Sequence, residues 1–217
     1  MSFRRYILAS RSPRRLELLQ QVVHPTLIEV RPPASADEAG FDDCQDLAAI
    51  RQRLLEIARN KAEQVRTALN AEEAELHERP RTLLISADTT VVITSHDQSP
   101  IVLGQPPEND DWRETVADWF RHHYAGRTHS VLTAVHVTTP DGRLGDQVVE
   151  TRVTFRKDLE RWLNWYLLTG EPRGKAGGYA LQAAGSVFVE RTEGSLSNVV
   201  GLPLEALLEL FADVSLR

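Results

Sequence analysis

The stretch YILASRSPRRLELL, residues 6–19, decides how the fold begins, because it predicts a strand, a tight loop and a helix in succession. Tyr6 to Ala9 is a short apolar run typical of a buried strand. Ser12 suits the N-cap of a helix, and Pro13 suits its first position, where a missing N–H breaks no helical bond. A helix start exposes free N–H groups and the positive end of the helix dipole. This segment therefore predicts a place where an anion binds.

Basic and hydroxyl side chains surround this helix start. Arg11, Arg14 and Arg15 supply positive charge, and Ser10 and Ser12 add hydroxyl donors. An arginine fork matches phosphate oxygens with two parallel hydrogen bonds. The same residues also fit a surface helix with solvated arginines, so the segment alone leaves both interpretations open.

The rest of the chain shows strand and helix patterns in a mixed order. Besides the helix that begins at Pro13, helices are predicted at 45–77, 109–122, 159–168 and 203–214. Besides the strand of residues 6–9, strands are predicted at 27–30, 82–94, 131–139, 147–156, 180–182 and 186–191. Loops are predicted at 32–43, 100–107 and 170–178. Strands and helices without strict alternation favour an α+β fold or a mixed α/β sheet.

Composition narrows the class of protein. The 217 residues suit one large α/β domain or one domain with two lobes, and 41% hydrophobic residues can supply its core. A net charge of -6 argues against broad electrostatic binding to DNA or RNA. Cys44 is the only cysteine, which excludes an internal disulfide and a cysteine-based zinc cluster. With no apolar run of membrane-spanning length, the sequence predicts a cytoplasmic protein that binds no membrane.

Asp88 interrupts the apolar strand predicted at 82–94. A carboxylate is rare in a protein interior unless it is paired or bound to a metal, so this one predicts a functional role. It can hold a divalent ion or accept a proton from water. The alternative is an aspartate that caps a strand end or a turn. Lys61 falls on the apolar face of the helix predicted at 45–77, from which it either snorkels to solvent or points into a cleft.

The segment TGEPRGKAGGYALQ, residues 169–182, is rich in glycine, which lets a backbone approach a ligand closely. Lys175 adds positive charge, and the Gln182 amide can hydrogen-bond the edge of a base. A flexible loop is the alternative interpretation. Three histidines, His122, His123 and His129, lack the context of a zinc motif and are predicted to be solvated surface residues.

Four motifs in this order resemble those of the Maf family. The chain reads LASRSPRRLELL at 8–19, ADTTVV at 87–92, KAGGYALQ at 175–182 and NVVGLPL at 198–204. The family patterns are close to LASxSPRRxELL, ADT, KAGxYxIQ and NVxGLPL, and GRTHSVLTAV at 126–135 is also similar to the family. The resemblance covers nearly the whole chain, and its first and last motifs are specific.

The resemblance implies an α/β fold of the Maf and ITPase kind, with a two-lobed mixed β-sheet and flanking helices. Residues 1–217 would form a single domain with a cleft between two lobes. The activity implied is hydrolysis of the α–β phosphoanhydride of a nucleoside triphosphate to a monophosphate and pyrophosphate, with a divalent metal cation, Mg or Mn. Thr89, which follows the aspartate of ADT, resembles the branch that acts on dTTP and UTP.

Carried over motif by motif, the resemblance assigns roles to individual residues. Asp88 would be the proton acceptor or a metal ligand, Lys61 would assist catalysis, and Glu38, beside Asp37, would help to hold the metal. Substrate binding is assigned to Ser10, Arg14, Arg15, Thr89, Lys175 and Gln182. The positions of base specificity in the family match Arg14, Thr89 and Gln182. The arginines and lysines of this set would neutralise the charge that develops on pyrophosphate.

Two departures from the family pattern bear on activity. The family usually has LGKP and DKAG, where this chain has Gln105 in place of the lysine and Gly174 in place of the aspartate. Arg113 and Arg127 are distant candidates to replace the lysine. Two functions stay open: a pyrophosphatase acting on pyrimidine triphosphates, including modified forms, or a catalytically weakened nucleotide-binding regulator of cell division and septum formation. Both imply a nucleoside triphosphate as partner, and the sequence leaves open whether the chain forms a homodimer.

Overall fold

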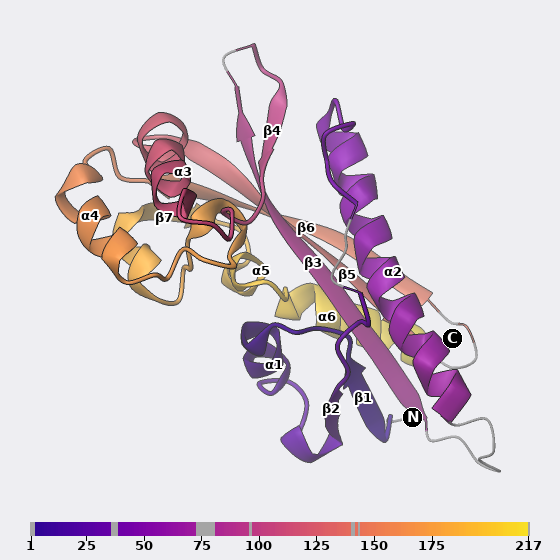
Figure 1. Ribbon diagram of the computed structural model, residues 1–217. Coiled ribbons are helices and arrows are strands. Elements are labelled where there is room, and N and C mark those ends of the chain that lie inside the picture. The colour runs from indigo at the N-terminus through magenta and orange to yellow at the C-terminus, as the bar shows by residue number, and fades with distance from the viewer. Residues whose placement is uncertain are drawn as a thin grey trace.

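The long strand β3 (Thr82–Thr94) lies at the centre of the fold, because its apolar run is buried on both faces. The computed structural model describes residues 3–35, 39–72, 81–95, 97–139, 142 and 144–216. In these residues seven strands form one mixed sheet, and helices flank it (Figure 1). The mixed α/β class predicted from the sequence is therefore confirmed.

The elements have the following bounds. The strands are β1 (Arg5–Leu8), β2 (Ile28–Val30), β3 (Thr82–Thr94), β4 (Pro100–Leu103), β5 (Thr128–Thr138), β6 (Leu144–Phe155) and β7 (Val189–Glu193). The α-helices are α1 (Pro13–Leu19), α2 (Leu47–Glu72), α3 (Trp112–Asp118), α4 (Glu160–Leu168), α5 (Leu196–Val200) and α6 (Leu204–Leu216). The short 3₁₀-helices are η1 (Pro25–Leu27), η3 (Ala176–Gly178) and η4 (Ala184–Phe188), and α3 continues as the π-helix η2 (Trp119–Tyr124).

β3 is paired along both of its edges, but one edge has a gap. The first edge pairs with β5 in antiparallel fashion from Leu84 to Val92. The second edge pairs in parallel with β1 over Thr82–Ile85 and in antiparallel fashion with β4 over Val91–Thr94. Among the described residues, no strand pairs with Ser86–Thr90 on this second edge. The order β2-β1-β3-β5-β6-β7 places this gap in the interior of the sheet.

Successive side chains of β3 point to opposite faces of the sheet. On one face, Leu84 packs against residues of α2, and Ser86 Oγ donates a 2.6 Å hydrogen bond to Ala58 O of the same helix. On the other face, the odd-numbered residues 83 to 87 join a core that includes residues of α1 and α6. This alternation continues at Asp88 and Thr89, so these two neighbours lie on opposite faces of the sheet.

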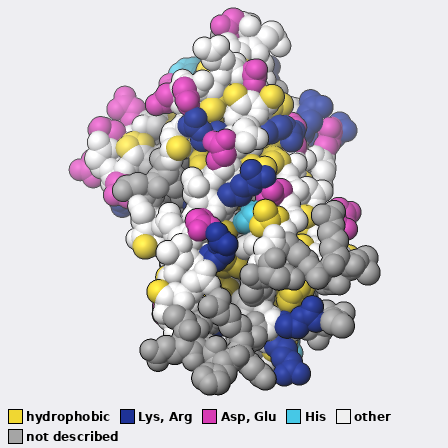
Figure 2. Space-filling view, turned by 90° about the vertical axis from the view of Figure 1, so that its right-hand side faces the viewer, with side chains coloured by type: hydrophobic (Ala, Val, Ile, Leu, Met, Phe, Trp, Pro, Cys, Tyr) yellow, Lys and Arg dark blue, Asp and Glu magenta, His cyan; other side chains and the backbone are white. Residues whose placement is uncertain are grey.

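Helix α2 runs along one face of the sheet, over β3, β5 and β6 (Figure 1). Its buried residues recur at helical spacing from Ile50 onward, which explains why one side of the helix faces the strands. Arg59 of α2 also pairs with Asp146 of β6 at 2.5 Å. The buried apolar residues and this ion pair hold α2 against the sheet, so that Lys61 lies over β3. On the face seen in Figure 2, basic and acidic side chains are interspersed.

The second half of the chain departs in places from the predicted elements. Residues 100–103, predicted as loop, form β4 because their short apolar run pairs with the end of β3. Residues 180–182 form no strand, and the predicted strand from residue 186 begins only at Val189. The reason is η4, whose first N–H groups bond to the Glu171 carboxylate instead of to a neighbouring strand. Within the described part of the chain, no helix is both long and apolar enough to span a membrane.

Candidate active site

A cavity of about 600 Å³ opens at the gap in the pairing of β3, a size common for small-molecule sites. The predicted site residues that line it are Ser10, Arg14, Arg15, Lys61, Asp88, Thr89, Lys175 and Gln182. Segments far apart in the sequence therefore meet at this cavity. Glu38 and Asp37 lie outside the described residues, so the part assigned to them stays a prediction.

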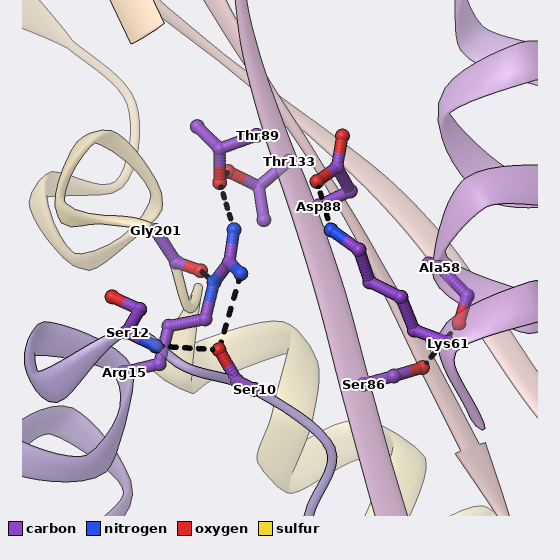
Figure 3. A network of polar contacts seen from close by, with 10 residues as sticks. All are labelled: Ser10, Ser12, Arg15, Ala58, Lys61, Ser86, Asp88, Thr89, Thr133 and Gly201. Atoms are coloured by element: carbon purple, nitrogen blue, oxygen red, sulfur yellow. Dashed lines mark hydrogen bonds and ion pairs between the residues drawn. The ribbon is translucent and has the colours of Figure 1, made fainter. Parts of the chain in front are cut away.

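Arg15 is held from three sides on the α1 face of β3 (Figure 3). Its Nε donates to Gly201 O at 2.8 Å, its Nη1 to Ser10 Oγ at 3.3 Å and its Nη2 to Thr89 Oγ1 at 3.1 Å. Ser10 Oγ also accepts the backbone N–H of Ser12 at 3.1 Å. Ser12 occupies the N-cap position, as predicted, but its side chain makes no capping bond. The hydroxyl that orders the loop is that of Ser10, which is buried.

Arg14 and Lys175 concentrate positive charge at the cavity. Burial lowers the pKa of the Arg14 guanidinium, against the opposite effects of Glu17 and Glu171. Burial also lowers the pKa of the Lys175 ammonium, and the nearby charge of Arg14 lowers it further. Partly buried cations whose charge is disfavoured in this way favour the binding of an anion nearby.

Asp88 and Lys61 meet on the opposite, α2 face of β3 (Figure 3). Lys61 Nζ donates to Asp88 Oδ1 at 2.6 Å, and the two side chains are 13% and 11% exposed. The interior carboxylate is thus paired, as burial requires. Both residues line the cavity, so Lys61 points into a cleft and does not extend into open solvent.

The glycine-rich segment packs against the loop after β4. Gly177 N–H donates to Gly104 O at 2.9 Å, and Tyr124 Oη donates to Gly177 O at 2.9 Å. Gly177 has a φ of +68°, and a Cβ there would lie 2.6 Å from both Tyr124 Oη and Val91 Cγ2. Only glycine fits this position. The contact brings Gln105, the residue after Gly104, into the lining of the cavity beside the glycine-rich segment.

His129 was predicted to be a solvated surface residue, and this prediction is wrong. Its side chain is 2% exposed, and burial lowers its pKa to about 3. The ring packs against Tyr124 and Phe155, and Nε2 lies 2.8 Å from Tyr179 Oη. Because β5 begins at Thr128, strand alternation turns His129 into the aromatic core. Tyr179 lines the cavity, so this neutral histidine supports the cavity wall.

Glu171 supports the site from outside the cavity lining, and sequence reasoning missed it. Its carboxylate accepts the N–H groups of Ala184 and Gly185 at 2.8 and 2.9 Å and the Tyr166 hydroxyl at 3.2 Å. Its backbone carbonyl accepts a bond from Lys175 Nζ. Glu171 therefore braces the segment that carries Lys175. A lone carboxylate within the glycine-rich stretch is the sequence feature that points to such a role.

Arg113 and Arg127 are the predicted candidates to replace the lysine that the family usually has at position 105. Neither Arg113 nor Arg127 is among the described residues that line the cavity. The Arg113 guanidinium instead lies 4.6 Å from the centre of the Trp112 ring. Arg11 does line the cavity, and its Nη2 donates to Pro33 O at 2.8 Å. Arg11 is thus the better placed cation.

Ligands for a metal ion are few in the described part of the cavity. Asp88 and Glu108 are the carboxylates that line it there. The described residues hold no cluster of three or more His, Cys, Asp or Glu side chains suited to a metal. Mg²⁺ often binds one or two protein carboxylates and completes its shell with water and substrate phosphates. The donor set therefore fits an ion that binds together with a polyphosphate.

Basic side chains outnumber acidic ones among the described residues of the lining. The basic residues are Arg11, Arg14, Arg15, Lys61 and Lys175, and the acidic ones are Asp88 and Glu108. Fold and site together define a mixed α/β protein with a cationic cavity at a gap in the pairing of its central strand. The model of the family described as "Maf-like protein" matches residues 5–214. The chain belongs to the Maf family, as its motifs predicted.

Curated relatives match over most of their length. A "dTTP/UTP pyrophosphatase" of Anaeromyxobacter sp. (strain Fw109-5) is 41% identical, over 97% of this chain and 89% of the relative. A protein of the same name from Brucella abortus (strain 2308) is 36% identical, over 95% of this chain and 90% of the relative. Among solved structures, a nucleoside-triphosphatase / dITP/XTP pyrophosphatase from Mycobacterium abscessus is 14% identical, with a TM-score of 0.42, over 70% of this chain and 75% of that one.

Proposed function

We propose that this protein hydrolyses dTTP and UTP to the nucleoside monophosphate and pyrophosphate. The observation that carries the proposal is the meeting of Asp88 with a set of cations at one cavity, in a chain whose relatives are named dTTP/UTP pyrophosphatases. We also propose that residues 1–217 act as a single domain with this cavity as its cleft.

The charge of the cavity fits a triphosphate. Phosphoryl transfer depends mainly on positioning and on stabilising the charge that builds on the leaving group. Arg14 and Lys175 are partly buried cations whose charge a phosphate chain would compensate. Arg15 lies beside them in a fixed orientation, because three separate bonds hold its guanidinium. These residues would bind the pyrophosphate portion as its negative charge increases.

Asp88 is the candidate for handling the water. In the reaction, water attacks the α-phosphorus, the bond to the bridging oxygen of the β-phosphate breaks, and pyrophosphate leaves. The attacking water gives up a proton, for which Asp88 is a suitable acceptor. Lys61 orients that carboxylate through the 2.6 Å bond to Oδ1.

A divalent cation belongs to this proposal. Asp88 would bind it, with Glu38 as the second predicted ligand, and Mg or Mn are the candidates. When bound, such an ion neutralises phosphate charge and polarises the bond that breaks. Gln182, which lines the cavity and is exposed, would contact the base through its amide.

The test is a panel of dTTP, UTP, CTP, GTP and ATP with Mg or Mn, in which pyrophosphate and inorganic phosphate are measured separately. The proposal expects pyrophosphate and monophosphate in equal amounts, fastest from dTTP and UTP. Release of inorganic phosphate with a diphosphate product would mean attack at the γ-phosphorus and would contradict it.

A second function, a nucleotide-binding regulator with weak catalysis, is favoured by one observation. Gln105 lines the cavity where the family usually has a lysine, and neither Arg113 nor Arg127 lines it among the described residues. This alternative predicts that dTTP or UTP binds in a calorimeter while turnover stays near the rate without protein. Turnover at an ordinary enzymatic rate would support the pyrophosphatase and exclude the weakly catalytic regulator.

A further inference from the structure

The hydroxyl groups of Thr89 and Thr133 join Arg15 to the backbone of α5 in a continuous line. Arg15 Nη2 donates to Thr89 Oγ1 at 3.1 Å, and Thr89 Oγ1 lies 3.0 Å from Thr133 Oγ1 (Figure 3). Thr133 Oγ1 in turn donates to Asn198 O at 3.0 Å. The line connects the helix start after β1, the middle of β3, β5 and the short helix α5.

The direction of each bond in this line follows from counting hydrogens. A threonine hydroxyl has one hydrogen to donate. Thr133 uses its hydrogen on the Asn198 carbonyl, so in the contact between the two threonines Thr89 must be the donor. Thr89 then accepts from Arg15 with a lone pair. Every proton in the line is therefore ordered from the guanidinium to the Asn198 carbonyl.

The far end of this line is rigid. Asn198 is fully buried, and its Nδ2 donates to Val131 O at 3.0 Å and to Thr151 Oγ1 at 2.9 Å. Its backbone N–H is capped by Ser195 Oγ at 3.2 Å. Gly201 is the C-cap of the same short helix, and its carbonyl accepts the Nε–H of Arg15. Two of the three bonds that orient Arg15 thus depend on the position of α5.

We propose that Thr133 is a positioning residue for the reaction, which acts on the triphosphate through Thr89 and Arg15. This inference rests on the proposed function. Thr133 is fully buried, so its side chain cannot touch a nucleotide. When Thr133 lacks its hydroxyl, Thr89 loses the acceptor that the described residues provide for its hydrogen, and it no longer presents a fixed lone pair to Arg15. A base-specificity position in the family pattern, Thr89, therefore acts here by holding a phosphate-binding arginine.

The experiment compares Thr133→Val, which keeps the shape and removes the hydroxyl, with Thr133→Ser, which keeps the hydroxyl. We expect Thr133→Val to lower kcat/KM on dTTP and UTP about threefold to tenfold, the effect of losing about one hydrogen bond. Thr133→Ser should restore most of it. The matched control is Thr138→Val, a buried threonine of the same strand whose hydroxyl bonds the adjacent carbonyl of Thr139 at 3.3 Å; its kcat/KM should stay at the wild-type value. Thermal denaturation of each variant separates loss of fold from loss of orientation.

A double-mutant cycle with Thr89→Val tests the line as one unit. Because both hydroxyls act through Arg15, the double variant should lose no more than the larger single loss. The inference would be overturned if the double variant lost the product of the two single losses in kcat/KM. It would also be overturned if a folded Thr133→Val protein kept the wild-type kcat/KM, or if Thr133→Ser failed to restore kcat/KM. If wild type itself releases no pyrophosphate from any triphosphate, the proposed function fails first. In that case dTTP affinity, measured by calorimetry on the same variants, decides the inference: unchanged affinity in Thr133→Val overturns it.

Discussion

At the scale of single residues, the carboxylate of Asp88 has the most direct test. We expect Asp88→Asn to lower turnover about 100-fold or more, because an amide neither accepts the proton from water nor binds a cation well. The fold should persist, since the amide oxygen still accepts a bond from Lys61 Nζ. The measurement is pyrophosphate release together with circular dichroism. Asp118→Asn, at an exposed carboxylate of α3, is the control and should be fully active. Substantial activity in a folded Asp88→Asn protein would remove Asp88 from the mechanism.

Substitution of Gln105 should raise catalytic efficiency, in contrast to substitution of Asp88. We predict that Gln105→Lys raises kcat/KM on triphosphates several-fold, because a charged donor binds phosphate about twice as strongly as a neutral one. The side chain is exposed in the cavity lining, so a lysine fits without repacking. Gln52→Lys, on an exposed part of α2, changes the net charge equally and should leave kcat/KM unchanged. Equal or lower efficiency in Gln105→Lys means that another cation, with Arg11 as the candidate, already compensates for the lysine.

At the scale of elements, the glycine-rich segment contains two glycines, Gly174 and Gly177, whose backbone lies in the left-handed region. Gly174 and Gly177 have φ values of +66° and +68°. A Cβ at Gly174 meets nothing within 4 Å, whereas at Gly177 it meets Tyr124 Oη and Val91 Cγ2 at 2.6 Å. Gly174→Ala should therefore cost only left-handed strain, about 1 kcal/mol.

Gly177→Ala adds a steric clash to that strain, and we expect a loss of roughly 2 kcal/mol or more in the free energy of unfolding. It should also lower activity, because the segment carries Lys175 and bonds to Gly104. Urea denaturation of both alanine variants checks the prediction. Equal destabilisation would show that the clash is relieved by a shift of the segment.

At the scale of the whole molecule, His129 predicts how stability depends on pH. Its pKa is about 3 in the folded protein, because burial disfavours the charged ring, and about 6.5 in the unfolded chain. Between these values the unfolded state binds the extra proton, so stability is fully present above pH 6.5 and falls as the pH is lowered towards 3. We expect a slope of roughly 1 kcal/mol per pH unit from this residue.

Urea midpoints of wild type and His129→Gln between pH 7.5 and 4.5 measure that contribution. The glutamine variant is less stable overall, but its midpoint should change less over this range. If both proteins lose stability with the same slope, other groups carry the acid sensitivity.

The whole fold also shows which features a sequence can predict. The bounds of β3 match the predicted strand, because a long apolar run has a strong local preference for strand structure. β4 escaped prediction because four residues acquire strand character only by pairing with β3. The family of the chain was correctly predicted from its motifs. The contact of Thr133 with Asn198, 65 residues apart, depends on tertiary packing and has no local sequence pattern. The roles assigned to the lining residues stay predictions.

The alternation of side chains along β3 restricts how this protein can change over generations. Asp88 and Thr89 are consecutive in the sequence but serve different faces of the sheet, with Lys61 on one side and Arg15 on the other. A single inserted or deleted codon before residue 88 would shift the strand by one position against β5 and exchange the two faces. The carboxylate would then meet the arginine, and the apolar residues of each face would meet the core of the opposite face. We expect inherited variation in β3 to consist of substitutions alone, with changes of length confined to the connecting loops.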